Sequence, residues 1–439
     1  MQAGLIAALL PLAAGSANQD AVPSTGTILR AAGASAADLP PALPAANAPP
    51  PLDIARFEAI AETLVANGRI PGMAMAIVKD GRILSARGYG VTDVRAPQPV
   101  DAHTVFRLAS LSKSFAGTMT GILVNDGVLR WDSRLTDFVP SFRLSMPDAA
   151  QQVTVADILS HRVGLPHNAL DRDLEANADY RDLTQRMANA PMACAPGQCY
   201  AYQNVAFSLI GDVVFATTGR FYSEEVARRI FKPLGMHDAS YGLEGIEASA
   251  RWAKPHVRGR GGWVSLMPKP NYYRVAPAAG VNASISDMAQ WLLAHTGHRP
   301  DVLPAPLLAT LHAPLISTPS EIRGASWRRE RLSSAGYALG WRAYNYAGHQ
   351  VVFHGGAVQG YRGAMALLPE QDLGVVILWN SESGLPSGLL PTILDSALGL
   401  QGGQWLDDDT LEASEGLLYA ERNGAPTNSS AWSAKASPP

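Results

Sequence analysis

The sequence predicts an α+β fold in which an antiparallel sheet is flanked by helices and a mainly helical segment forms a second lobe. Three observations support this prediction. Two apolar runs, 73–78 and 83–89, flank a short turn near the start of the folded region. Apolar residues at helical spacing then dominate from about Ser110 to Leu293, and strand patterns return from Tyr337 onward. The early and late strands are expected to join in one sheet, with the helical middle as the second lobe.

The first expected element is an amphipathic helix. Apolar residues recur at helical spacing from Ile54 to Val65, and Gly68 follows as a stop signal. The next element is a β-hairpin, because the Gly-containing turn 79–82 separates the two early apolar runs.

The late part of the chain predicts four strands, two turns and a final helix that packs back on the sheet. Turn residues fill 345–348 and 370–374, and the helix is expected at 389–398. A cleft between the two lobes is the expected place for a functional site. The four strand patterns are Tyr337–Tyr346, Gln350–Phe353, Arg362–Leu368 and Val375–Trp379.

The chain is expected to have four segments: a signal peptide at 1–17, a linker at 18–51, a folded domain at 52–405 and a disordered tail at 406–439. An apolar run at 3–14 precedes the small residues at 15–17, as in a signal peptide, although neither Lys nor Arg comes before it. A mis-assigned start codon is the alternative and leads to the same compartment. The linker is rich in Ala, Pro, Ser and Gly. We therefore expect a periplasmic or secreted protein.

The composition excludes some classes of partner. The chain has 439 residues, 47% of them hydrophobic, and a formal net charge of −3 with scattered basic residues. Such a balance gives no general attraction to nucleic acid. The apolar run at 3–14 is too short to span a bilayer, so stable membrane insertion is not expected. The expected partner is a small-molecule or peptide substrate.

Cys194 and Cys199 are the only cysteines. In an exported chain such a pair favours a local disulfide, and in a reducing compartment the two remain plain thiols. Two thiolates are too few for a structural zinc site, so neither a metal nor another cofactor is expected. A disulfide here would shape the loop just before Tyr202.

Ser110-Leu111-Ser112-Lys113 is the central chemical signal. On a helix, residues three apart share a face, so the Lys113 amine is expected to lie against the Ser110 hydroxyl. Serine needs such a base to become nucleophilic, and burial depresses a lysine pKa toward neutrality. The chain has six lysines, and no other serine has a lysine three places later. The alternative is a surface helix, which the apolar flanks from Val105 to Leu123 disfavour.

Two further motifs supply chemistry of the matching kind. Tyr202-Gln203-Asn204 offers a phenol that relays a proton and an amide that binds a substrate amide. His354-Gly355-Gly356-Ala357 begins near a late strand, where glycines admit substrate backbone and a backbone N–H completes an oxyanion hole with that of Ser110. An ordinary Gly-rich turn is the alternative for the second motif.

Taken in order, these motifs resemble the serine β-lactamase-like superfamily, in the branch of class C β-lactamases, D,D-carboxypeptidases, D-aminopeptidases and related esterases. The resemblance runs from about Ile54 to Leu398 and implies the β-lactamase/penicillin-binding-protein fold, with 52–405 as a serine hydrolase domain. The supporting stretches are Pro71 to Ala74, Thr154 to His161, Gly164 to Pro166, and Ala279 to Val281 with Ser284, Asp287 and Met288.

The resemblance implies a role for each site residue. Ser110 is the acylated nucleophile, Lys113 its base and Tyr202 the proton relay. The substrate-binding residues are Asn204, His354, Gly356 and Ala357, of which Ala357 gives the second oxyanion N–H. His161 is expected to be structural.

Two positions depart from the commonest patterns of this superfamily. Gln203 stands where serine is frequent, and His354 stands where lactamases and many carboxypeptidases carry lysine. A largely neutral histidine holds a substrate carboxylate less well, and its hold is expected to strengthen as the pH falls from 8 to 5.5. The expected function is therefore a serine hydrolase that cleaves an amide or ester of a small peptide-like substrate. A class C-like β-lactamase and a non-hydrolytic penicillin-recognising sensor are the alternatives.

Overall fold

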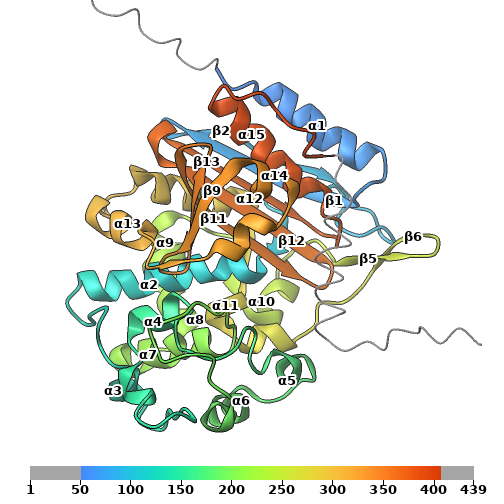
Figure 1. The fold of residues 1–439 in the computed structure, drawn as a ribbon. Coiled ribbons are helices and arrows are strands. Elements are labelled where there is room, and N and C mark those ends of the chain that lie inside the picture. The colour runs from blue at the N-terminus through green and yellow to red at the C-terminus, as the bar shows by residue number, and fades with distance from the viewer. Residues whose placement is uncertain (1–50, 407–439) are drawn as a thin grey trace, which may run out of the picture. The chain divides into compact units, whose positions relative to one another are not determined.

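The computed structural model describes residues 51–406 (Figure 1). The expected signal peptide lies outside these residues, as do the linker except Pro51 and the tail except Leu406. Within them, no helix combines the length and the apolar character that crossing a bilayer requires.

One eight-stranded antiparallel sheet organises the fold, in the order β2-β1-β13-β12-β11-β10-β9-β8. The hairpin β1–β2 lies beside the last strand, with Met73 of β1 opposite Trp379 of β13. The predicted union of early and late strands is therefore confirmed. The strands are β1 Gly72–Lys79, β2 Arg82–Gly90, β8 Ile316–Ser317, β9 Leu332–Tyr337, β10 Arg342–Tyr346, β11 His349–Val358, β12 Tyr361–Leu368 and β13 Leu373–Trp379.

The hairpin turn forms as its sequence predicts. Asp80 and Gly81 both have positive φ, 51° and 70°. Two consecutive residues with positive φ make the turn whose twist matches that of the flanking strands.

The prediction of a single strand from Tyr337 to Tyr346 is wrong. Strand β9 ends at Tyr337, the chain turns through 338–341, and β10 begins at Arg342. Gly340 has a φ of 80°, and the Ala338 N–H donates to the Trp341 carbonyl at 2.7 Å. The apolar side chains of this loop are buried, so the apolar run in the sequence continues across the turn. The sequence pattern therefore does not reveal that the chain turns here.

Helices cover both faces of the sheet and build the second lobe (Figure 1). They are α1 Ile54–Ala66, α2 Ser112–Asn125, α3 Leu135–Phe138, α4 Val155–Leu159, α5 Asp171–Glu175, α6 Tyr180–Arg186, α7 Leu209–Thr218, α8 Tyr222–Val226, α9 Lys232–Leu234, α10 Gly242–Glu247, α11 Ala276–Ala279, α12 Ile285–Leu293, α13 Ala305–His312, α14 Ser326–Arg331 and α15 Leu389–Ala397. Smaller strands are β3 Val105–Arg107, β4 Ser240–Tyr241 and β7 Val281–Ser284 in one sheet and β5 His256–Gly259 with β6 Gly262–Ser265 in another.

The sheet separates two hydrophobic cores. Alternate residues of β1 enter each of them: Met75 and Ile77 pack in the core with α1 and α15, while Ala76 and Val78 pack in the core with α2 and α12. A strand buried on both faces is apolar throughout rather than alternating, which explains the continuous apolar run in the sequence.

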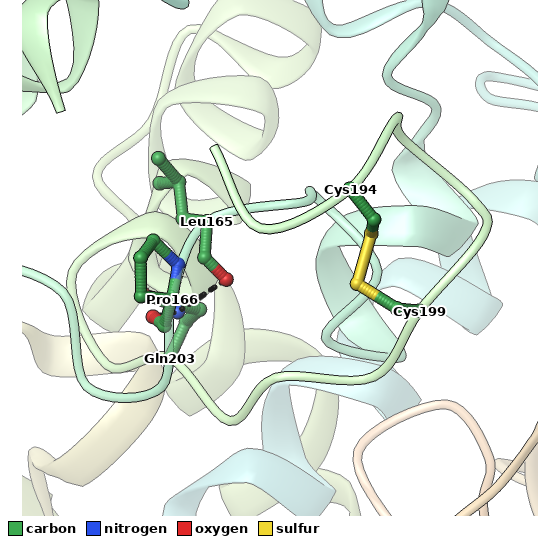
Figure 2. Close-up of a disulfide and its surroundings, with 5 residues drawn as sticks. All are labelled: Leu165, Pro166, Cys194, Cys199 and Gln203. Carbon is green, nitrogen blue, oxygen red and sulfur yellow. Dashed lines mark hydrogen bonds between the residues drawn. A yellow bond between two sulfur atoms is a disulfide. The ribbon is translucent and has the colours of Figure 1, made fainter. Parts of the chain in front are cut away.

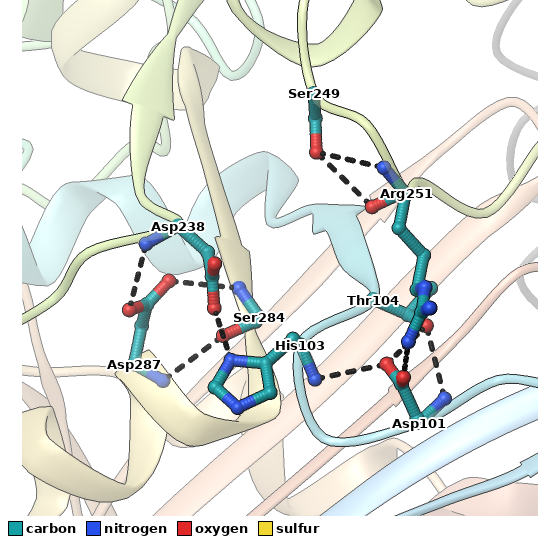
Figure 3. A network of polar contacts seen from close by, with 8 residues as sticks. All are labelled: Asp101, His103, Thr104, Asp238, Ser249, Arg251, Ser284 and Asp287. Atoms are coloured by element: carbon teal, nitrogen blue, oxygen red, sulfur yellow. Dashed lines mark hydrogen bonds and ion pairs between the residues drawn. The ribbon is translucent and has the colours of Figure 1, made fainter.

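Helix α12 packs on β1, β2 and β13, and its start is fixed by a polar network (Figure 3). Ser284 and Asp287 form a capping box, in which each side chain accepts the other residue's backbone N–H. The second oxygen of Asp287 accepts the Asp238 N–H at 3.2 Å, and Asp238 contacts His103 at 2.9 Å. The segment before β4 is thus tied to the loop before β3, which leads directly to Ser110.

Candidate active site

Ser110 lies on a 3₁₀ turn, η1 Ala109–Leu111, between β3 and α2. Ala109 has a φ of 48°, an uncommon left-handed conformation for a residue with a side chain. The next residues continue directly into α2, so Lys113 follows one helical turn after Ser110. Ser110 lines a cleft of about 1130 Å³.

Lys113 is fully buried behind Ser110 and has three polar neighbours. Its Nζ lies 3.3 Å from Ser110 Oγ, 2.7 Å from Asn204 Oδ1 and 3.1 Å from the Ala278 carbonyl oxygen. The last two groups are acceptors that take an N–H, whereas a hydroxyl both donates and accepts. A neutral amine thus satisfies both carbonyls and turns its lone pair toward the Ser110 proton.

The surroundings of Lys113 favour that neutral form. Burial lowers the pKa of the Lys113 amine well below its usual range, the Asp171 carboxylate raises it, and the Arg342 guanidinium lowers it. The amine also lies over the Tyr202 ring, 4.5 Å from its centroid. A lowered pKa is the property that a lysine needs in order to accept a proton from a serine hydroxyl.

Tyr202 has the opposite electrostatic character. Burial raises the pKa of its phenol above the usual range, while the Arg342 charge and a hydrogen bond with Ser110 act in the other direction. A phenol that keeps its proton suits donation to a leaving group. Environments that separate the pKa values of two neighbouring groups in this way are typical of acid and base partners.

The Tyr202–Asn204 segment is held from behind by buried contacts. The Gln203 N–H donates to His161 Nδ1 at 3.2 Å, and the Gln203 amide reaches the carbonyls of Leu165 and Pro166 (Figure 2). A disulfide joins Cys194 and Cys199 just upstream (Figure 2). The bridge expected for an exported chain is therefore present, and His161 has the structural position that the sequence indicates.

Strand β11 packs directly on the Ser110 turn. A Cβ added at Gly356 would lie 2.4 Å from the Leu108 carbonyl oxygen and 3.2 Å from the Leu111 nitrogen, so this position requires glycine. Gly356 and Ala357 line the cleft together with Ser110, Tyr202 and Asn204. The backbone of β11 therefore lies on the same cleft as the candidate nucleophile.

The comparison with known families agrees with this geometry. A family model described as Beta-lactamase matches residues 57–397. The chain belongs to the Beta-lactamase family. Its fold is the β-lactamase/penicillin-binding-protein fold, as the sequence predicts.

Several proteins resemble this family member. It is 26% identical to Unguisins hydrolase ungD' of Aspergillus campestris over 86% of this chain and 72% of that protein. It is 26% identical to Protein flp of Staphylococcus aureus over 75% of this chain, but spans only 63% of that protein's length.

Two solved structures show the same fold. The octameric penicillin-binding protein homologue from Pyrococcus abyssi has a TM-score of 0.71 at 24% identity and covers 84% of this chain and 82% of its own. The D-amino acid amidase from Ochrobactrum anthropi SV3, complexed with L-phenylalanine amide, has a TM-score of 0.63 at 22% identity. The match covers 78% of this chain and 96% of the amidase chain.

His354 is placed differently from the sequence expectation. Its side chain is 1% exposed and is not among the cleft-lining residues of the described chain. Its Nε2 lies 3.0 Å from the Tyr337 hydroxyl and its Nδ1 lies 2.7 Å from the Gly355 carbonyl oxygen. Burial, with the charges of Arg342 and Lys113, lowers the pKa of His354 well below its usual range. The expected titration between pH 8 and 5.5 is therefore contradicted, because the ring stays neutral.

Asp171 is a site residue that the sequence did not reveal. It begins α5, is buried, and lines the cleft. Its Oδ2 accepts a hydrogen bond from the Asn204 amide at 2.7 Å and one from the Tyr272 hydroxyl at 3.3 Å. Burial raises the pKa of Asp171 to about 6. No fixed spacing links Asp171 to Asn204, which lies 33 residues later, so only the folded chain shows the pair.

Replacing Asp171 with asparagine is expected to move the acidic limb of the kcat/KM profile to lower pH. The asparagine oxygen still accepts from Asn204, but the negative charge that raises the Lys113 pKa is gone, so Lys113 loses its proton at lower pH. Rates measured between pH 5 and 9 test this shift. Asp173→Asn is the matched control, because Asp173 is on the same helix and pairs with Arg186. An acidic limb that stays in place in Asp171→Asn contradicts the assignment.

The described residues contain no group of three or more His, Cys, Asp or Glu side chains arranged to hold a metal ion.

Proposed function

We propose that this chain is a serine hydrolase that cleaves an amide or ester bond of a small peptide-like substrate through an acyl-enzyme on Ser110. The observation that carries the proposal is the buried Lys113 amine. It lies 3.3 Å from Ser110 Oγ, and two carbonyl oxygens take its N–H groups. A nucleophile beside a base whose pKa burial has lowered is the arrangement that covalent catalysis needs.

Acylation follows from these contacts. Lys113 takes the hydroxyl proton as Ser110 Oγ attacks the substrate carbonyl carbon. The oxyanion that forms accepts hydrogen bonds from the backbone N–H groups of Ser110 and Ala357. Collapse of the tetrahedral intermediate breaks the bond to the leaving group, which takes a proton from the Tyr202 phenol.

Deacylation returns the enzyme to its starting state. Lys113, protonated in the first half, returns a proton to the Tyr202 phenolate, whose ring centre lies 4.5 Å from the amine. A water molecule then loses a proton to Lys113 and attacks the acyl carbon. The second tetrahedral intermediate collapses, the bond between the acyl carbon and Ser110 Oγ breaks, and Ser110 Oγ takes back the proton that Lys113 accepted from the water. The product acid then leaves the cleft.

Relatives support hydrolysis without fixing the substrate. The names Unguisins hydrolase and D-amino acid amidase describe hydrolytic proteins that share the family or the fold. A class C-like β-lactamase and a non-hydrolytic penicillin-recognising sensor are the other candidates. The buried, inward-turned His354 differs from the lysine that lactamases carry at that position, which ranks the lactamase behind the first candidate.

We also propose that the protein is exported to the periplasm or secreted. The apolar run at 3–14 supports this, as does the Cys194–Cys199 disulfide, since such bonds persist in oxidising compartments.

Turnover of a substrate panel tests the proposed function. The panel contains activated esters, D- and L-aminoacyl amides and the cephalosporin nitrocefin. We expect ester or amide hydrolysis that Ser110→Ala abolishes, and nitrocefin turnover that is much slower. Fast nitrocefin hydrolysis favours the lactamase instead. Binding of penicillin without turnover of any member of the panel favours the sensor.

A further inference from the structure

One wall of the cleft is basic. The segment η8 Pro319–Arg323, helix α14 and strand β10 together bring four arginines and one glutamate to the cleft lining. These residues, which we call the arginine wall, are Arg323, Arg328, Arg329, Arg342 and Glu321.

Glu321 is shared between two of the arginines. Its Oε2 lies 2.8 Å from Arg328 Nη1, and its Oε1 forms an ion pair with Arg342. The Tyr344 hydroxyl donates to the same carboxylate at 3.1 Å. One negative charge therefore faces two positive charges, and this part of the wall keeps a net positive charge.

One nitrogen in this group has no hydrogen-bond acceptor among the described residues. Arg328 Nε is buried and unpartnered, whereas Arg342 Nη1 forms its ion pair with Glu321. The Arg342 side chain is only 15% exposed. Burying a charged donor without an acceptor is unfavourable, so Arg328 Nε is suited to receive an anion from the cleft, beside the guanidinium of Arg342.

Arg342 is also close to the candidate catalytic residues. Its guanidinium carbon lies 5.5 Å from the centre of the Tyr202 ring and 5.6 Å from that of Tyr337. Tyr202 hydrogen-bonds with Ser110, so an anion bound at Arg342 would lie close to the candidate nucleophile.

We propose that Arg342 and Arg328 bind a carboxylate of the substrate, an inference that rests on the proposed hydrolase function. The cation that sets a preference for anionic substrates then stands on β10 and not at His354 of β11, the neighbouring strand. A guanidinium presents a planar fork that matches a carboxylate and stays charged at all working pH values. The carboxylate is carried either by the acyl group or by the leaving group.

Two matched ester pairs test the proposal and distinguish those two sources. 3-Carboxyphenyl acetate and its methyl ester differ in charge on the leaving group. Mono-4-nitrophenyl adipate and its methyl ester differ in charge on the acyl group. Each kcat/KM is divided by the spontaneous hydrolysis rate of the same ester. For one of the two pairs, we expect the normalised wild-type kcat/KM to be about 10-fold or more higher for the carboxylate than for its methyl ester. A hydrogen bond to a charged group contributes a free energy that corresponds to roughly this ratio.

Arg342→Gln and Arg328→Gln are each expected to lower that preference by about 10-fold. Arg130→Gln is the matched control, because Arg130 is exposed and pairs with Asp132, and it should leave the preference unchanged. Glu321→Gln keeps both guanidinium groups and removes their counter-charge, so the preference should rise. This opposite change separates a binding role from simple damage to the fold, which circular dichroism also monitors.

The proposal is overturned if the kcat/KM ratio of carboxylate to methyl ester is near one in both pairs. It is also overturned if the wild-type preference for the carboxylate persists in both arginine variants. The neutral methyl esters report on the proposed function separately. If the wild type hydrolyses them while the ratio stays near one, only the arginine assignment fails. If neither these esters nor any member of the substrate panel is hydrolysed, the hydrolase function fails and the arginine assignment fails with it.

Discussion

Replacing Lys113 with alanine is expected to lower kcat/KM by about 10²- to 10⁴-fold, the usual effect of removing a general base. The Lys113 amine lies within reach of Ser110 Oγ, and burial lowers its pKa. Tyr202 is poorly suited to replace it, because burial raises the pKa of its phenol. Steady-state kinetics on an activated ester measure the loss.

Three variants separate the base from the charge and the volume of Lys113. Lys113→Met fills much of the space without a base, and Lys113→Arg keeps the charge but holds its proton. Both should be as inactive as Lys113→Ala. Because Asn204 and the Ala278 carbonyl lose a donor, the alanine variant should also lose about 1–3 kcal/mol of stability. Activity within a few fold of wild type in any folded variant shows that another group acts as the base.

Replacing Gly356 with alanine should lower both stability and activity. The added Cβ would lie 2.4 Å from the Leu108 carbonyl oxygen, so β11 and the Ser110 turn must move apart. Overpacking of this kind costs about 1–3 kcal/mol. A displaced oxyanion donor typically lowers kcat by about 10²- to 10³-fold. Thermal unfolding and ester kinetics measure the two effects.

The neighbouring glycine provides the control for Gly356→Ala. A Cβ at Gly355 meets the Phe353 ring at 3.5 Å, an ordinary contact, so Gly355→Ala should keep a Tm close to that of the wild type. Equal Tm values for the two alanine variants contradict the close packing of β11 on the Ser110 turn.

Local patterns in the sequence predicted much of the fold and the centre of the site. The hairpin at 79–82 and the pairing of Ser110 with Lys113 depend on residues a few positions apart, which the sequence displays directly. The turn at 338–341 was missed because its apolar residues are buried like those of the strands beside it.

The parts of the site that were not predicted depend on tertiary contacts. Asp171 meets Asn204 across 33 residues, and Arg342 of β10 meets Glu321 of η8, which precedes β9 in the sequence. Neither pair has a characteristic spacing, so each became visible only when the chain was folded. The place of His354 was missed for a related reason: its partner, the Tyr337 hydroxyl, comes from another strand.

The acyl-enzyme on Ser110 is tested most directly by mass spectrometry after labelling with a fluorophosphonate. Trypsin cleaves after Arg107 and Lys113, so Ser110 and Ser112 fall in the peptide 108–113 and Ser114 falls in the next one. Fragment ions then separate Ser110 from Ser112. We predict one adduct, on Ser110, that is absent from Ser110→Ala and strongly slowed in Lys113→Ala. An adduct on Ser112 or Ser114, or labelling that persists in Ser110→Ala, would contradict the mechanism.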